Sequence, residues 1–156
     1  MIFVTVGTHY HGFERLVKKM DEIAAKIDEE VIMQIGYADY EPKNARWFKF
    51  LNYDEITTFY RKANLIVSHA GAGTLLDILN LDKPCIIVPR LKKYGEISDD
   101  RQIELAKALE GRKRGIIVYN VSDIGTEMFK VSILENKEIE GKSLINFLKN
   151  YSFDRL

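Results

Sequence analysis

Cysteine, unbalanced charge and long apolar runs are all scarce in this sequence. The single cysteine, Cys85, cannot form an internal disulfide, and its place in Pro84-Cys-Ile-Ile-Val88 indicates a buried small side chain in a reducing compartment. Basic and acidic residues number 23 each, so the composition gives no electrostatic reason to expect nucleic acid. No apolar run approaches the roughly 20 residues of a membrane span, and the first residues carry no basic signal-peptide region. We therefore expect a cytoplasmic chain that binds no nucleic acid.

Metal-binding patterns are missing as well. The three histidines, His9, His11 and His69, are scattered and accompanied by one distant cysteine, which does not make a zinc site. No Asp-x-Asp motif occurs, and Asp99-Asp100 fits better as the cap of a helix that starts there. We expect no metal and no other cofactor.

What the chain does have is enough apolar residues for one core. Its 156 residues, 46% hydrophobic and 29% charged, fit a single soluble domain. Short apolar runs predict strands at 2–6, 31–35, 47–51, 65–68, 85–88 and 116–119, with helical patterns between most of them. This alternation predicts an α/β fold, a Rossmann-like and mainly parallel sheet with helices on both faces. Weaker patterns predict a short helix at 123–128 and a terminal amphipathic helix at 142–151.

The stretch 64–79 carries the clearest functional pattern. It begins as a buried strand, continues as a turn of small residues and ends with apolar residues at helical spacing. This order leaves unpaired N–H groups at a helix N-terminus, which suit a phosphate. Gly71 and Gly73 remove Cβ atoms that would hold a ligand away from the backbone, and Thr74 adds a hydroxyl donor. Asp77 lies about one turn inside the helix, where its carboxylate could accept from two ribose hydroxyls.

Two interpretations of this turn remain open at this point. Glycines between a strand and a helix often serve only close packing, and this turn is neither a Walker A motif nor the dinucleotide fingerprint. A second glycine turn, Gly7 to Gly12, follows the first strand, and a basic loop, 90–97, long enough to move, follows the strand 85–88. Because the carboxyl ends of parallel strands share one edge of a sheet, we expect all three features to line one crevice.

Several separated motifs together resemble a known family. They are Ser68-His-Ala-Gly-Ala-Gly-Thr-Leu-Leu-Asp77, Lys83-Pro84, Val88-Pro89-Arg90 and Asp99-Asp-Arg-Gln-Ile-Glu-Leu-Ala106. This ordered set resembles the donor half of family 28 glycosyltransferases, which have GT-B architecture. The opening Phe3-Val-Thr-Val-Gly-Thr8, with Phe13 and Leu16, is similar to the small subunit of two-component UDP-GlcNAc and exopolysaccharide glycosyltransferases. The resemblance covers roughly residues 1–119 and implies one half of a GT-B enzyme.

The resemblance implies a UDP-sugar site. The resemblance puts Gly7 and Thr8 near the diphosphate or the gap between sugar and acceptor, and Phe50 and Leu51 against uracil. It puts Asp77 on the ribose and Gln102 on the donor sugar, and it includes Arg90 in the site. The residues around the diphosphate are His69, Gly71, Ala72, Gly73 and Thr74. The family usually has Glu at the position of Asp77, and the two-component group often has His at that of Arg101, a difference that bears on sugar choice. The general base is unidentified. His9 is the catalytic candidate, whereas His11 fits a surface or capping role better.

The implied chemistry is attack by an acceptor hydroxyl on the anomeric carbon of a UDP-sugar, with UDP leaving. The resemblance implies a donor-binding subunit, with UDP-GlcNAc as the expected donor, that moves a hexosyl or N-acetylhexosaminyl group to a lipid-linked acceptor in polysaccharide biosynthesis. A membrane-anchored partner subunit would supply the acceptor surface and hold this chain at the cytosolic side of the membrane. The segment 142–151 either binds that partner or packs on the chain's own sheet. The alternative is a non-catalytic nucleotide-sugar-binding or regulatory module.

Overall fold

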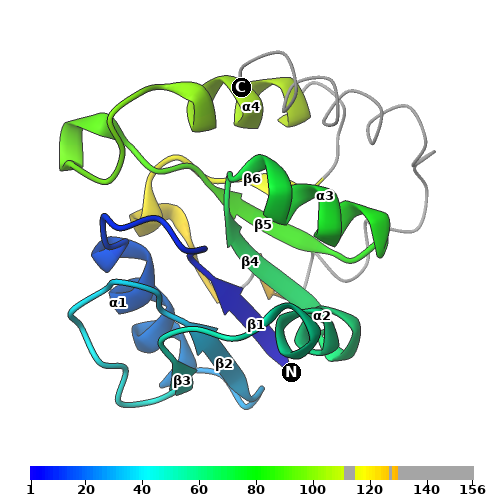
Figure 1. Cartoon of the computed structure of the whole chain (residues 1–156). Coiled ribbons are helices and arrows are strands. Elements are labelled where there is room, and N and C mark those ends of the chain that lie inside the picture. The colour runs from blue at the N-terminus through cyan, green and yellow to red at the C-terminus, as the bar shows by residue number, and fades with distance from the viewer. Residues whose placement is uncertain (111–114, 127, 130–156) are drawn as a thin grey trace.

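The described residues form a parallel sheet with helices on both faces (Figure 1). The computed structural model describes residues 1–110, 115–126 and 128–129. Its strands are β1 (Ile2–Thr5), β2 (Val31–Gln34), β3 (Arg46–Phe48), β4 (Leu65–His69), β5 (Cys85–Val88) and β6 (Ile116–Ile117). They lie in the order β3-β2-β1-β4-β5-β6, and each of these neighbouring pairs is parallel. The α/β class predicted from the sequence is confirmed.

The middle of the sheet sets where a ligand can approach. The chain builds outward from β1 through β2 to β3, and then turns to the other side of β1 with β4, β5 and β6. In a doubly wound sheet a crevice forms beyond the carboxyl ends of the strands at such a reversal. Thr5 at the end of β1 lies opposite Ser68 near the end of β4. The two glycine turns that follow these strands are therefore neighbours.

Alternate residues of the strands pack against helices on opposite faces. The helices are α1 (Glu14–Ala24), α2 (Tyr53–Lys62), α3 (Ala72–Asn80) and α4 (Arg101–Glu110). Val4 of β1 belongs to a buried cluster with Leu16 of α1, whereas its neighbour Phe3 belongs to a cluster with Leu75 of α3 and Leu105 of α4. Successive side chains of a strand point to opposite faces, so α1 covers one face and α2, α3 and α4 cover the other (Figure 1).

Element ends differ from the sequence predictions more than the elements themselves. β5 has the predicted bounds, but β3 and β6, the two edge strands, are shorter than the apolar runs that predicted them. A 3-10 turn, η2 (Val121–Asp123), lies just before the predicted helix 123–128, and its Asn120 side chain accepts from the Ser122 amide at 3.2 Å. The predicted helix 142–151 lies outside the described residues.

The basic loop that follows β5 is anchored by its own polar side chains. The sequence predicted a loop free enough to move, but Arg90 and Glu96 are 1% and 6% exposed. The Glu96 carboxylate accepts from the Leu91 amide at 2.8 Å and from Arg15 Nε of α1 at 2.7 Å. Between these anchors the loop makes one 3-10 turn, η1 (Lys92–Tyr94). Two charged residues of the loop, Arg90 and Glu96, thus hold it in place.

Candidate functional site

The two glycine turns border one cavity of about 720 Å³ at the carboxyl ends of β1 and β4. We call it the donor cavity, after the UDP-sugar site that the sequence resemblance implies. The turn after β1 contributes Gly7, Thr8, His9 and Tyr10, and the turn after β4 contributes His69 and residues 71–74. The other lining residues come from β2 and the loop after it, the loop before α2, and helices α2, α3 and α4: Gln34, Tyr37, Leu51, Tyr53, Ile56, Tyr60, Asp77 and Gln102. The crevice predicted from the carboxyl-end rule is present between the two glycine turns, and its volume falls within the range of small-molecule sites. The basic loop 90–97, which was expected to line the same crevice, contributes no residue to it.

His69 fills the space between the two turns. A Cβ placed on Gly7 or on Gly71 would collide with the His69 imidazole. Gly7 also has a φ of +72°, which L side chains rarely adopt. Of the two interpretations left open for this turn, the structure supports close packing at Gly71, because the His69 imidazole occupies the space of its missing Cβ. A Cβ on Gly73, by contrast, would meet no atom within 4 Å, so the argument from ligand approach stands for Gly73 alone.

Helix α3 points an uncapped N-terminus into the donor cavity. Gly71 is its N-cap and provides no side-chain hydrogen bond, and the first intrahelical bond runs from the Leu75 amide to the Gly71 carbonyl at 2.9 Å. The amides of the first turn are left for an outside acceptor. Helix α2 is different, because Asn52 and Glu55 cap it reciprocally at 2.9 Å each. The chain therefore caps α2 with its own side chains and leaves α3 open where it meets the cavity.

Asp77 and Tyr53 stand together at the rim of the donor cavity. The Tyr53 hydroxyl donates to Asp77 Oδ1 at 3.5 Å, a long hydrogen bond. Burial raises the pKa of Asp77, and the Tyr53 hydrogen bond opposes that rise. A carboxylate held in this way, about one turn into α3, retains lone pairs for further hydroxyl donors. Tyr53 is 66% exposed, so its ring is also available to a ligand.

The lining of the donor cavity carries almost no positive charge. No lysine or arginine is among its lining residues, and Asp77 is the one carboxylate there. Burial, reinforced by the positive charge of Arg90, lowers the pKa of His69 to about 3, so its ring is neutral at pH 7. An anion in this cavity would therefore be held by backbone amides and neutral donors.

His9 is placed as a hydrogen-bond donor. Burial lowers its pKa, and Arg90 lowers it further, so the ring is neutral at pH 7. The backbone amide of His11 donates to His9 Nδ1 at 3.3 Å. The neutral ring then carries its proton on Nε2, which can donate to a ligand and cannot accept a proton as a base in this tautomer. His11 packs against Tyr10 with ring centroids 4.2 Å apart and does not line the donor cavity.

Arg90 supports the site through hydrogen bonds but is not among the residues that line the cavity. Its guanidinium donates to the carbonyls of Val6, His11 and Gly12 at 2.7–2.8 Å, which fixes the turn after β1. Its backbone amide donates to Gln102 Oε1 at 3.0 Å. The Gln102 amide nitrogen makes no hydrogen bond within the described part of the chain, so it is presented to the cavity as a donor. The structure thus places Gln102 in the cavity and Arg90 outside its lining.

The base end of the predicted site is only partly in the donor cavity. Leu51 lines it, whereas Phe50 is 45% exposed and packs edge-on against Tyr37 with ring centroids 5.0 Å apart. Tyr37 and Gln34 were not predicted. Both lie at the carboxyl end of β2, so the rule that pointed to the glycine turns could have found them. Gln34 Oε1 is buried with no hydrogen-bond partner among the described residues, and it is a further acceptor facing this site.

Comparison with known proteins decides the family. The family model for the glycosyltransferase family 28 C-terminal domain matches residues 1–146. The chain belongs to this family. The resemblance found in the sequence motifs is thereby confirmed.

Relatives of this family 28 domain include UDP-GlcNAc transferases. It is 33% identical over 129 residues to UDP-N-acetylglucosamine transferase subunit ALG13 of Homo sapiens, a match that covers 76% of this chain and 11% of that protein. It is 26% identical over 136 residues to a UDP-N-acetylglucosamine--N-acetylmuramyl-(pentapeptide) pyrophosphoryl-undecaprenol N-acetylglucosamine transferase of Prochlorococcus marinus, which covers 85% of this chain and 34% of that protein. The chain thus spans about a tenth of the first relative and about a third of the second.

Solved structures share the fold at lower identity. The glycosyltransferase of kitacinnamycin superimposes with a TM-score of 0.63 at 16% identity, covering 96% of this chain and 37% of that one. The solution structure of ALG13 superimposes with a TM-score of 0.56 at 18% identity, covering 99% of this chain and 92% of that one. Within the described part of the family 28 domain, no helix is long and apolar enough to cross a membrane.

Proposed function

We propose that this family 28 domain is the donor-binding subunit of a heteromeric glycosyltransferase. It binds a UDP-sugar, UDP-GlcNAc in the first instance, and a membrane-anchored partner supplies the surface for a lipid-linked acceptor. Both relatives are named as N-acetylglucosamine transferases, which supports UDP-GlcNAc as the donor. The word subunit in the human relative's name supports a partner.

One observation carries the proposal: the uncapped N-terminus of α3 opens into a cavity at the strand reversal, with Asp77 one turn further on. A UDP-sugar needs hydrogen-bond donors for its diphosphate and a hydrogen-bond acceptor for its ribose hydroxyls. This arrangement offers both, in the order in which the two parts of the ligand follow each other. The diphosphate lies on the amides of residues 72–74, the ribose on Asp77, and the sugar towards Gln102. Leu51 and Tyr53 border the uracil.

The chemical contribution of this half is stabilisation of the leaving group. As UDP departs, negative charge grows on its diphosphate, and fixed amide dipoles and neutral donors stabilise that charge without reorganising. The α3 amides, Thr74 and His9 Nε2 are such donors. No metal is required in this scheme, since the helix N-terminus takes the place of a cation.

A graded series at Gly73 tests the donor site. Gly73→Ala and Gly73→Val place one and three carbon atoms in open space over the α3 amides. We expect calorimetric UDP affinity to fall stepwise, by at least ten-fold for valine, while thermal unfolding stays within the modest range of helix propensity differences. UDP binding that is unchanged in a folded Gly73→Val protein would place the nucleotide elsewhere.

A non-catalytic nucleotide-sugar-binding module is the second candidate, and the His9 geometry favours it. With Nδ1 occupied by the His11 amide, His9 offers a donor and no base, so the catalytic candidate from the sequence is not placed to deprotonate an acceptor. Adding the membrane-anchored partner with labelled UDP-GlcNAc and a lipid-linked acceptor separates the two. Transfer that depends on both chains supports the enzyme, and binding without transfer supports the module.

A further inference from the structure

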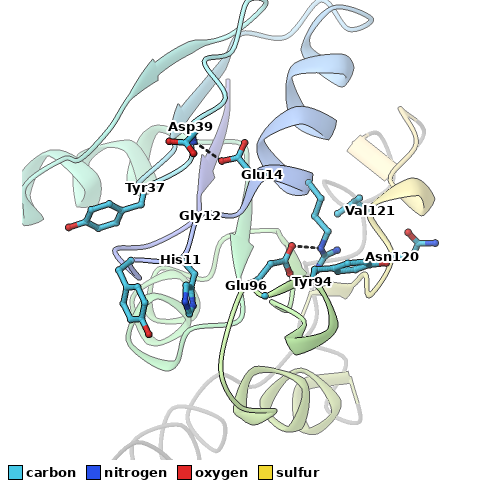
Figure 2. Close-up of a pocket in the computed structure, with 12 residues that line it drawn as sticks. His11, Gly12, Glu14, Tyr37, Asp39, Tyr94, Glu96, Asn120 and Val121 are labelled. Atoms are coloured by element: carbon cyan, nitrogen blue, oxygen red, sulfur yellow. Dashed lines mark hydrogen bonds and ion pairs between the residues drawn. The ribbon is translucent and has the colours of Figure 1, made fainter.

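A second cavity, of about 790 Å³, opens beside the donor cavity and shares Tyr10 and Tyr37 with it. We call it the tyrosine cavity, because its other wall carries Tyr94 (Figure 2). It lies over the start of α1, outside every position that the family resemblance assigned. In Figure 2, Tyr37 and Tyr94 stand on opposite sides of the hollow, with Glu14 and Asp39 at another edge.

The three tyrosines are unusually exposed for their size. Tyr10, Tyr37 and Tyr94 are 68%, 54% and 57% exposed, and they make up most of the large exposed hydrophobic side chains in the described part of the chain. Exposed aromatic rings gathered around one hollow mark a binding surface more often than chance scatter does. A tyrosine ring offers a rigid, flat, apolar face with a polar tip. The apolar C–H face of a pyranose ring is a complementary surface.

The charges around the tyrosine cavity disfavour anions. Arg15 is its one cationic lining side chain, and Glu96 pairs with it at 2.7 Å. The two terminal nitrogens of Arg15 also donate to the carbonyls of Pro89 at 2.7 Å and Tyr119 at 3.3 Å. Glu14 and Asp39 form no ion pair within the described part of the chain, so their edge of the cavity is negatively charged.

The first turn of α1 confirms that this is a different kind of site from α3. Glu14 stands in that turn, and its carboxylate accepts from the amides of Asp39 at 2.6 Å and Tyr40 at 3.2 Å. A phosphate approaching the α1 N-terminus would meet this carboxylate. The tyrosine cavity therefore repels the charged groups that the donor cavity accommodates.

The free polar groups of the cavity suit a ligand rich in hydroxyls. Asp39 has a carboxylate with no hydrogen bond within the described part of the chain, and it can accept from two hydroxyls. Asn120 Oδ1 accepts from the Ser122 amide, which leaves the Asn120 amide nitrogen to donate. The tyrosine hydroxyls can do either. Hydroxyl and amide groups and one carboxylate, set between aromatic walls, match an uncharged sugar better than a lipid tail or a phosphate.

We propose that the tyrosine cavity binds an uncharged pyranose, the acceptor sugar, beside the donor cavity. The acceptor role rests on the proposed function, because it requires a UDP-sugar in the adjoining cavity. The shared wall of Tyr10 and Tyr37 places the two ligands next to each other. This chain then contributes part of the acceptor site itself, and the partner subunit contributes the remainder.

The test is saturation-transfer NMR on the full chain with methyl β-D-glucoside, cellobiose and methyl β-D-glucuronide. We expect millimolar binding of the neutral probes and at least five-fold weaker binding of the anionic glucuronide. Tyr94→Ala should reduce binding of the neutral probes at least five-fold, because Tyr94 lines only the tyrosine cavity. Lys92→Ala, on the same 3-10 turn and outside both linings, is the matched control and should bind like the parent chain.

A charge variant tests the electrostatic half of the proposal. Asp39→Asn keeps the shape of the side chain and removes its charge, so the difference in affinity between glucoside and glucuronide should shrink. An unchanged difference would overturn the charge argument. Absence of any signal from the neutral probes, or signal that survives Tyr94→Ala, would overturn the site.

UDP titration of the same proteins separates this inference from the proposed function. Tyr94→Ala should bind UDP like the parent chain. A parent chain that binds UDP and no glycoside refutes the tyrosine cavity alone. A parent chain that binds glycosides and no UDP refutes the acceptor role together with the donor site, and one that binds neither refutes both.

Discussion

At the scale of single residues, His69 makes folding sensitive to acid. Its neutral ring fills the space that Gly7 and Gly71 leave open, and its pKa in the folded chain is about 3. An unfolded chain protonates the same imidazole near its ordinary value of 6.5. Because the unfolded state binds this proton first, the stability that the neutral ring provides is complete above about pH 6.5 and is lost as pH falls toward 3.

We expect His69 to account for about 2–3 kcal/mol of the stability lost between pH 8 and pH 4.5. Urea unfolding of the parent chain and of His69→Gln at both pH values measures it. Glutamine is uncharged throughout, so the variant should lose less stability on acidification by that amount. Equal pH dependence in the two proteins would mean that His69 is protonated in the folded state without penalty.

Asp77 belongs to the same scale and links ligand binding to pH. Burial raises its pKa above the ordinary value, and only the ionised form accepts from both ribose hydroxyls. UDP affinity should therefore rise with pH through this raised pKa in the parent chain, and Asp77→Asn should lack that component. UDP phosphates titrate identically in both proteins, so the difference between them isolates Asp77.

At pH 7.5 we expect Asp77→Asn to weaken UDP about ten-fold, since a hydrogen bond to a charged group contributes about 1.5–3 kcal/mol. The variant should also lose the preference for ribose over 2′-deoxyribose. Calorimetry with UDP and its 2′-deoxy analogue measures both. Asp54 is an exposed residue of α2 outside the cavity lining, so Asp54→Asn should behave like the parent chain.

At the scale of elements, the local sequence pattern predicted the strands of the sheet well and the contacts of the loops between them poorly. Buried parallel strands are continuous apolar runs, so the strands could be placed from the sequence, and the carboxyl-end rule then located the cavity. The role of Arg90 could not be found in this way, because its guanidinium reaches carbonyls 78 to 84 residues earlier in the chain. Likewise the reason for Gly71 is its contact with His69, which no spacing reveals.

The loop that carries Tyr37 depends on one buried carboxylate of α1. Asp21 is 2% exposed and accepts from the Tyr40 hydroxyl at 2.7 Å and from the amides of Lys43 and Asn44. Burial alone would raise the pKa of Asp21, but these hydrogen bonds outweigh it and hold the pKa below its ordinary value. The carboxylate therefore fastens the segment between β2 and β3 to α1.

Asp21→Asn should destabilise the fold by about 1–3 kcal/mol, because two backbone amides would face the donor end of an amide in place of a carboxylate. Urea unfolding at pH 7 measures the loss. Glu22→Gln, an exposed neighbour on the same helix, should stay within about 0.5 kcal/mol of the parent chain. Equal stability of the Asp21 variant would show that the loop is held by its other contacts.

At the scale of the whole molecule, the balance of charge in the donor cavity predicts independence from metal ions. The cavity has one carboxylate, Asp77, and an open helix N-terminus, which the proposed binding mode assigns to the ribose and the diphosphate. The protein would offer a divalent cation one carboxylate at most, and the proposed ribose contact already occupies it, so the protein would add little to the cation's coordination by phosphate oxygens and water. UDP affinity of the full chain should therefore change less than about two-fold between EDTA and millimolar Mg²⁺. A ten-fold loss in EDTA would contradict this scheme.

One arginine anchors both the turn after β1 and Gln102, which limits how the sugar specificity could be redesigned. The Arg90 guanidinium donates to three carbonyls of the turn after β1, and the Arg90 backbone amide donates to Gln102 Oε1. The turn and Gln102, on two sides of the proposed sugar end of the cavity, therefore depend on one residue. Exchanging Gln102 or its helix for that of a relative with a different sugar would leave the support mismatched. A chimaera aimed at new sugar specificity should therefore transplant residues 6–12, 89–97 and 101–102 as one unit, since none of the three segments is a separable module.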